Sequence, residues 1–379
     1  MSSLDIVPVK TRSARKAFVQ LPWDLYRGDP NWIAPLRQDL RERVGYLSHP
    51  FYDDAEIQTF LAMRDKKPCG RIAAIVNHGH NRRFKEQRGF FGFFESIDDQ
   101  AVANGLFDAA RSWFAERDIT MMRGPTNPSL NYEIGTLVDG FDSPPTFMMT
   151  YNPPYHGRLI EEYGFRKTQD LYEFWGHLDM LKTLDKKLAF VAEESAKRFN
   201  VTLRRIDTSR YMEDVRMFLR IYNESLGGTW GYVPLSEGEV NHMAAGMRRL
   251  LVPEMTTVAE IDGKPIGVAL ALLDYNPRIH QIDGRLYPFG FLTLLRNKRA
   301  IKKIRSISTN VVPEYQKWGL GLALLDRLVP DMLEWGIEEI EFSWVLESNH
   351  LSRKTLERGG AVLKKTYRLY DWSEEESDL

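Results

Sequence analysis

The stretch from Val311 to Leu328, VVPEYQKWGLGLALLDRL, joins the end of a β-strand to the start of a helix through a glycine-containing loop. Pro313 cannot donate to a strand ladder and therefore ends the strand. Gly319 and Gly321 have no Cβ, so a ligand can approach the backbone closely at both positions. The first N–H groups of the following helix have no intrahelical acceptor, and the helix dipole favours an anion beside them. This pattern is typical of a strand, loop and helix that bind a phosphate.

Two common phosphate-binding sequences do not match this loop. A Walker loop requires Gly-Lys followed by Ser or Thr, and a dinucleotide-binding loop requires a third glycine. The spacing Gln-x-x-Gly-x-Gly, on Gln316, Gly319 and Gly321, instead resembles the acyl-coenzyme A loop of the GNAT acyltransferase superfamily. The alternative interpretation is a tight helix start that binds nothing.

The resemblance implies where the coenzyme binds. In the family the pantetheine arm lies between two splayed strands and the loop holds the pyrophosphate. The later stretch ESNHLSRKTLERGGA is similar to the family's last helix, in which an asparagine contacts the coenzyme. The residues expected to bind acyl-CoA are Val311, Val312, Gln316, Lys317, Trp318, Gly319, Leu320, Gly321, Leu322 and Asn349.

Both halves of the chain show the same order of predicted elements: helix, helix, hairpin, strand, helix, strand, helix, strand. This repeat predicts an α/β unit that is used twice. Together with the resemblance, it implies an α/β protein of two tandem GNAT-like domains, each a mixed, mostly antiparallel twisted sheet flanked by helices. The predicted parts are an N-terminal domain (1–180), a helical linker (181–200), a C-terminal domain with the acyl-CoA site (201–373) and an acidic disordered tail (374–379). The first half lacks the glutamine and glycine spacing, so its coenzyme loop is expected to be degenerate.

N-acyl transfer from a thioester requires a base for the amine and an acid for the leaving thiolate. Many GNAT members carry a tyrosine as this acid seven residues after the helix asparagine, where this chain has Leu356. Glu347 and His350 flank Asn349 and are candidate bases, although either can simply serve the start of the helix. Asp283 and Tyr315 are further catalytic candidates.

The segment Asn276–Arg305 is unusual because an apolar stretch, LYPFGFLTLL, precedes a run with six basic residues in ten. Such a pattern is typical of a segment at a membrane surface or of the wall of a lipid channel. A buried loop with a solvated turn is the alternative, and the basic residues can instead meet the 3′-phosphate of the coenzyme. The residues predicted to contact substrate or lipid are Tyr287, Phe289, Phe291 and Leu294, with Asn131 and Glu133 bordering a shared cleft.

The composition limits the kinds of ligand and partner that we expect. The net charge of −1 gives no broad basic face for nucleic acid. Cys69 is the single cysteine, which excludes an internal disulfide and a zinc site of several cysteines, and no metal is expected. The N-terminal stretch does not read as a secretory signal. We expect a cytoplasmic protein, with peripheral contact at the inner face of the membrane through Phe289–Arg305.

The order of several short stretches resembles a bacterial group of tandem GNAT proteins that includes bacterial ceramide synthases. These stretches are PWDLYRGDPNWIAPL, GFFGFFE, RGPTNPSLNYEIG, NPPY, TWGYVP and SWVLESN. The resemblance implies an acyl-CoA-dependent N-acyltransferase of lipid metabolism that transfers a fatty acyl chain to a sphingoid base or similar lipid amine. Three alternatives stay open: a small-molecule N-acetyltransferase, a non-catalytic acyl-CoA-binding protein and an aminoacyl-tRNA-dependent transferase.

Overall fold

The computed structural model describes residues 3–183 and 186–374, which form two compact units. Within the described residues, unit 1 comprises 3–171, 276–291 and 365–374, and unit 2 comprises 172–275 and 292–364. The units therefore differ from the predicted division at residue 180, because unit 1 also takes two segments from the second half. Most of the predicted acidic tail, from residue 375 onward, lies outside the described residues.

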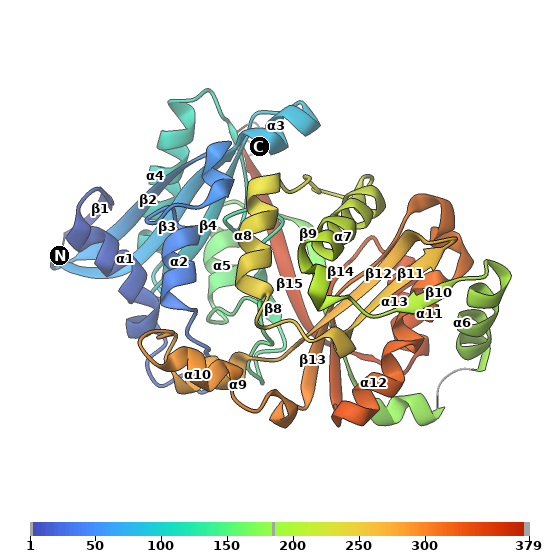
Figure 1. The fold of residues 1–379 in the computed structure, drawn as a ribbon. Coiled ribbons are helices and arrows are strands. Elements are labelled where there is room, and N and C mark those ends of the chain that lie inside the picture. The colour runs from blue at the N-terminus through green and yellow to red at the C-terminus, as the bar shows by residue number, and fades with distance from the viewer. Residues whose placement is uncertain (1–2, 184–185, 375–379) are drawn as a thin grey trace. The chain divides into compact units, whose positions relative to one another are not determined.

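Unit 1 contains a mixed sheet in the order β1-β2-β3-β4-β5-β15, in which only β4 and β5 pair in parallel (Figure 1). Its strands are β1 (Leu4–Pro8), β2 (Ala55–Arg64), β3 (Lys67–Asn77), β4 (Arg88–Ser96), β5 (Met121–Gly124), β6 (Thr126–Asn127), β7 (Glu133–Ile134), β8 (Thr136–Asp139) and the final part of β15 (Val362–Ser373). Its helices are α1 (Arg12–Leu25), α2 (Arg37–Arg43), α3 (His78–Phe84), α4 (Gln100–Ala115), α5 (His156–Glu162) and α9 (Asn276–Gln281). Strand β9 (Arg166–His177) and helix α10 (Gly290–Leu295) are divided between the two units.

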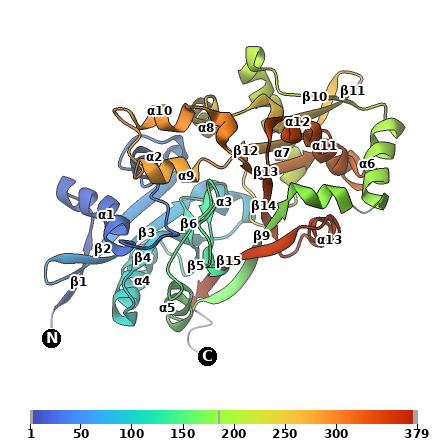
Figure 2. The ribbon, with the colours of Figure 1, turned by 90° about the horizontal axis from the view of Figure 1, so that it is seen from below.

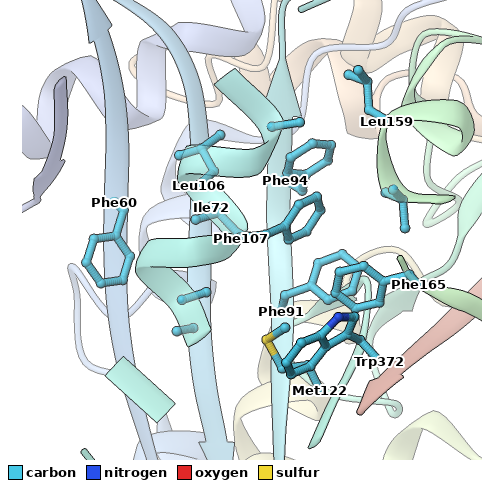
Figure 3. Packing of buried hydrophobic residues seen from close by; sticks show 14 of the residues in the cluster. Phe60, Ile72, Phe91, Phe94, Leu106, Phe107, Met122, Leu159, Phe165 and Trp372 are labelled. Atoms are coloured by element: carbon cyan, nitrogen blue, oxygen red, sulfur yellow. The ribbon is translucent and has the colours of Figure 1, made fainter. Parts of the chain in front are cut away.

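The core of unit 1 has two apolar layers, one on each face of the sheet. Helices α4 and α5 cover one face, while α1 and α2 cover the other (Figure 2). On the α4 face, the rings of Phe94 and Phe107 stack with centroids 4.9 Å apart, and Phe165 packs 4.9 Å from Phe107 (Figure 3). Such aromatic packing contributes more than burial of apolar area alone.

In unit 1, the backbone around Thr126 crosses the space beyond the last parallel pair of β4 and β5. The parallel pairing ends at Phe90 and Arg123. Beyond it, Asn127 Oδ1 accepts a hydrogen bond of 2.6 Å from the N–H of Phe93. Gly92 has no room for a side chain, since a Cβ there would lie 1.7 Å from the carbonyl oxygen of Thr126. The backbone near Thr126 therefore lies directly against β4.

Unit 2 repeats the arrangement with a sheet in the order β14-β13-β12-β11-β10. Its strands are β10 (Thr202–Arg204), β11 (Thr256–Ile261), β12 (Lys264–Leu273), β13 (Lys303–Val311) and β14 (Glu339–Leu346). Its helices are α6 (Lys186–Arg198), α7 (Tyr211–Leu226), α8 (Glu237–Met247), α11 (Leu320–Asp326), α12 (Leu328–Trp335) and α13 (His350–Arg358). Only β13 and β14 are parallel among these strand pairs, so the predicted mixed, mostly antiparallel sheet flanked by helices is confirmed in both units.

Two local features of unit 2 follow directly from its residues. The hairpin between β11 and β12 turns at Asp262 and Gly263, both of which have positive φ angles, of 50° and 74°. The predicted helix after the glycine loop is interrupted at Arg327, giving α11 and α12. Pro330 explains the break, because it has no N–H to donate to the carbonyl group of Asp326.

The predicted helical linker is a helix, α6, and it belongs to unit 2. It packs along α11, and Val191 lies so close to the coenzyme loop that a Cβ on Gly319 would be 2.5 Å from its Cγ1. The helix is therefore a part of the C-terminal fold that contacts the predicted coenzyme loop.

Candidate functional site

The parallel pairing of β13 and β14 ends inside the sheet of unit 2. The paired residues run from Lys303 with Glu339 to Ser306 with Phe342. After this point β13 continues along β12 only, up to Val311. We call the place where β13 and β14 part, after Ser306 and Phe342, the fork. An extended ligand can enter a sheet at such a place and bond to exposed backbone groups.

A β-bulge in β13 lies beside the fork. Ser306 pairs with Ala271 and Ser308 pairs with Leu270, so Ile307 has no partner on β12. A bulge leaves one residue's backbone groups outside the ladder, and bulges often lie next to active sites. The backbone polar groups of Ile307, which are unpaired with β12, therefore lie beside the fork.

The predicted coenzyme loop follows β13 as a 3₁₀ helix, Pro313–Trp318, and α11 begins at Leu320. Gly319 between them has a φ angle of 79°, a conformation that glycine adopts without strain. The side chain of Gln316 donates to the carbonyl groups of Val311, at 3.0 Å, and Ser225, at 3.1 Å. Gln316 thus ties the loop to β13 and α7, which leaves the loop backbone as the predicted anion-binding group.

The other predicted coenzyme residues fall into three environments. Val311 and Leu320 are buried in the fold, while Lys317 and Trp318 are exposed on the loop. Val312 and Leu322 are partly buried. Asn349 caps α13, because its Oδ1 accepts a 3.1 Å hydrogen bond from the N–H of Ser352. Contact of Asn349 with a coenzyme stays a prediction.

Gly321 is in a different environment from Gly319. A Cβ on Gly321 would lie 3.6 Å from Thr309 Cγ2, which is an ordinary contact. Gly319 has no such space, because α6 packs against it. Substitutions at Gly321 therefore test the loop without moving α6.

Three predicted catalytic residues lie in unit 2, around the coenzyme loop and the start of α13. Glu347 is partly buried just after β14, and His350 is exposed at the first position of α13. The ring of Tyr315 packs edge-on against Phe199, 5.5 Å away. Leu356, at the place of the usual tyrosine acid, packs on an apolar cluster that contains Phe174 and Val345. The usual acid is therefore replaced by an apolar contact.

Asp283, the fourth predicted catalytic residue, belongs to unit 1. Its Oδ1 accepts a 2.7 Å hydrogen bond from Trp23 Nε1, and its Oδ2 lies 3.5 Å from Arg37. Nearby, a Cβ on Gly284 would lie 2.1 Å from the carbonyl oxygen of Pro35, so the backbones touch there. These contacts make Asp283 an anchor for the 276–291 segment, and a catalytic role for it stays a prediction.

The predicted lipid-contact residues are split by the structure. Tyr287 and Phe289 are exposed, Phe291 is partly buried and Leu294 is buried. Asn131 and Glu133 lie in unit 1, in the segment around the short β7 strand.

Glu133 forms an ion pair of 2.8 Å with the buried Arg43. The ion pair offsets the cost of burying the charged guanidinium group. Burial lowers the pKa of Arg43, but the neighbouring Asp39 and Glu133 outweigh this and hold the pKa above its usual range. Glu133 is thus engaged in the structure of unit 1.

The sequence did not predict a buried polar network that lies at the fork. Ser343 Oγ donates to Glu341 Oε1 at 2.6 Å and accepts from Arg305 Nε at 2.8 Å. Arg305, Glu341 and Ser343 are all at most 3% exposed. Lys303 Nζ lies 3.7 Å from Glu341 Oε2, and no hydrogen bond to that oxygen is formed by any described residue. Three polar side chains therefore converge within one residue of the last β13–β14 pair.

Unit 1 has its own buried carboxyl group, Glu95 on β4. Burial raises the pKa of Glu95 to about 7, although the charge of Arg71 opposes this. Tyr26 donates a 2.7 Å hydrogen bond to it, and Arg71 lies 3.5 Å away. These partners satisfy the carboxyl group within the core of unit 1.

Comparisons with known proteins agree with the predicted family. The model of the acetyltransferase (GNAT) family matches residues 216–360. A protein of Caulobacter vibrioides described as "Bacterial ceramide synthase" is 35% identical over 98% of this chain and 97% of its own length. Protein YghO of Escherichia coli K12 is 33% identical over 94% of this chain and 92% of its own length.

Solved structures show the same fold at low sequence identity. A tandem GNAT protein from the clavulanic acid biosynthesis pathway has a TM-score of 0.57 at 12% identity, with 98% of each chain covered. A GCN5-related N-acetyltransferase from Sphaerobacter thermophilus has a TM-score of 0.54 at 14% identity, covering 98% of this chain and 95% of its own. The tandem arrangement predicted from the repeat of elements is therefore confirmed.

Proposed function

Because this chain belongs to the acetyltransferase (GNAT) family and is an N-acyltransferase, we propose that it transfers a fatty acyl chain from acyl-CoA to the amine of a sphingoid base or similar lipid. The observation that carries the proposal is the fork of β13 and β14, with a bulge at its mouth and the glycine loop at the end of β13. A thioester within this fork would meet backbone groups on β13. The loop backbone at Gly319 to Gly321 would meet the diphosphate.

The buried network supplies a route for a proton. A proton that leaves the substrate ammonium group passes to Ser343 Oγ while the Ser343 proton moves to Glu341. The neutral amine then attacks the thioester carbon, so a C–N bond forms and the C–S bond breaks. The thiolate leaves and takes the second amine proton, while Glu341 returns its proton through Ser343. The unpaired backbone at Ile307 offers an N–H to the developing oxyanion.

The lipid character of the substrates rests on two observations. The relative described as a bacterial ceramide synthase matches this chain over nearly its whole length. The segment before β13 also keeps large apolar side chains in water: Tyr287 is 67% exposed, Phe289 is 73% exposed and Leu292 is 54% exposed. An exposed apolar cluster of this kind marks an interaction surface.

The charge next to this cluster favours an anionic membrane surface as its partner. Arg296 and Arg299 follow along the chain and are exposed. No helix in the described parts of the chain is long and apolar enough to cross a bilayer. We therefore propose reversible attachment of Tyr287–Arg299 to the membrane surface, where lipid substrates reside.

Flotation with vesicles tests this attachment. With vesicles containing anionic phospholipid, we expect the double variant Phe289→Ser, Leu292→Ser to lose at least about 80% of the floated protein, since each exposed apolar side chain contributes to interfacial binding. The matched control is Leu351→Ser, because Leu351 on α13 is 72% exposed. Equal flotation of the double variant and the wild type would contradict membrane contact by this segment.

An acyl-CoA length series tests the function itself. We expect affinity measured by calorimetry to rise from acetyl-CoA to palmitoyl-CoA, by about tenfold or more, because each buried CH₂ group contributes about 0.8 kcal/mol. Release of free thiol with sphinganine as acceptor would then report transfer. Preference for acetyl-CoA without reaction on sphinganine would support a small-amine acetyltransferase instead.

A further inference from the structure

We propose that the C-terminal end of α6 and the exposed Trp318 form the binding site for the 3′-phosphoadenosine portion of coenzyme A. The proposal rests on the proposed function, because it extends the same coenzyme site outward from the diphosphate loop. In the sequence, α6 reads as a linker between two domains. In the structure it is packed against the loop, and its last turn presents a cation there.

Aromatic contacts fix α6 to the loop. The ring of Phe199, one residue beyond α6, packs edge-on against both Tyr315 and Trp318, with centroids 5.5 Å away in each case. Val191 meets Gly319 about two turns earlier on the same helix. The loop residues and the end of α6 therefore form one surface.

This surface has the chemistry that a nucleotide with a phosphate needs. Trp318 is 42% exposed, although it is large and apolar. The guanidinium group of Arg198 lies over its ring, 4.3 Å from the centroid. A stacked guanidinium keeps its in-plane N–H groups available, so it can bind a phosphate while the aromatic surface receives an adenine base.

Two cations on this surface have no anionic partner among the described residues. Neither Arg198 nor Lys317 forms a hydrogen bond or ion pair with any described side chain, and both are exposed. By contrast, Lys197, the neighbour of Arg198, forms ion pairs with Glu193 at 2.5 Å and Glu194 at 3.7 Å. The pair Arg198 and Lys317 thus offers two positive charges beside Gly319, where the diphosphate of the coenzyme is expected to bind.

The basic run before β13 does not compete for this role. Arg299 contacts Trp335, 4.8 Å from its ring centroid, and the carbonyl group of Glu334, at the end of α12. Residues 320–335 form about 24 Å of helix at 1.5 Å per residue, divided between α11 and α12, so the end of α12 lies away from the glycine loop. Farther along the run, Arg305 is buried and bonded to Ser343.

Calorimetry with coenzyme A and 3′-dephospho-coenzyme A separates this site from the diphosphate loop. The wild type is expected to bind coenzyme A at least about tenfold more tightly, because a charged hydrogen bond to the 3′-phosphate is lost in the dephospho form. Arg198→Ala should weaken the binding of coenzyme A by a similar factor and change the affinity for the dephospho form by no more than about twofold. Lys197→Ala is the matched control and should keep the preference. Trp318→Leu should weaken the binding of both ligands, because it removes the stacking surface.

Equal binding of the two ligands by the wild type would overturn the proposal and leave the proposed function standing. Equal weakening of both ligands by Arg198→Ala would also overturn it, since that pattern indicates a displaced α6. Failure of the wild type to bind either ligand would refute the coenzyme loop and the proposed function together.

Discussion

Replacing Gly321 by Asp is expected to raise the dissociation constant for acyl-CoA by at least about 100-fold and to abolish transfer. Gly321 is the second residue of α11, next to the backbone N–H groups that the proposal assigns to the diphosphate. A carboxylate there occupies the anion site and repels a second anion. Its folding cost is small, because a Cβ at this position meets only Thr309 Cγ2, at 3.6 Å, and an acidic residue is favourable in the first turn of a helix.

Gly321→Asn is the matched control for this experiment, since it has the same size without the charge. We expect Asn to weaken acyl-CoA binding by less than the Asp variant, with about a tenfold difference between the two. Calorimetry gives both dissociation constants, and thermal unfolding checks the fold. Normal binding by the Asp variant would mean that the loop is only a well-formed helix start. Gly319 is unsuitable for the test, because a side chain there would also push Val191 of α6 away.

Local features of the fold could be predicted because each has a local physical cause. Asp65 and Lys66 have positive φ angles and form the turn between β2 and β3, two apolar runs on either side of turn-forming residues. The break between α11 and α12 follows from the missing N–H of Pro330. The glycine loop also lies where its residues predicted, between β13 and α11.

Pairing between distant segments could not be predicted in the same way. The final strand, β15, was expected to complete the second domain, yet Tyr370 pairs with Gly124 in unit 1. An apolar, alternating segment specifies a strand but not its neighbour in the sheet. The same limit applies to Asp283, whose partner Trp23 is 260 residues away in the sequence.

The buried network at the fork was missed for a related reason. In EEIEFSW, Glu339, Glu341 and Ser343 alternate with apolar residues, which is the pattern of a strand with one face in water. Burial of Glu341 is tolerated because Arg305 and Lys303 on β13 supply opposite charges. Those cations also alternate in sequence, so only the pairing of β13 with β14 reveals that the two polar faces meet.

Replacing Glu341 by Gln is expected to lower kcat by about 100-fold or more with little change in acyl-CoA affinity. The variant keeps the size of the side chain and its capacity to accept from Ser343, but it removes the group that receives the proton. Removing one charge of a buried pair also destabilises the fold. Calorimetric binding of acyl-CoA by the variant therefore has to accompany the kinetic measurement, to show that the site is still folded.

The pH dependence of kcat distinguishes a base from a structural residue. The profile of kcat against pH should change in Glu341→Gln, because the group that receives the proton is gone. Ser343→Ala should also lower kcat, because the hydroxyl group that donates to Glu341 is gone. Glu347→Gln is the matched control, since Glu347 lies five residues beyond the last β13–β14 pair at Phe342. A large loss in Glu347→Gln together with an unchanged pH profile in Glu341→Gln would assign the base to Glu347 and leave the buried network a structural role.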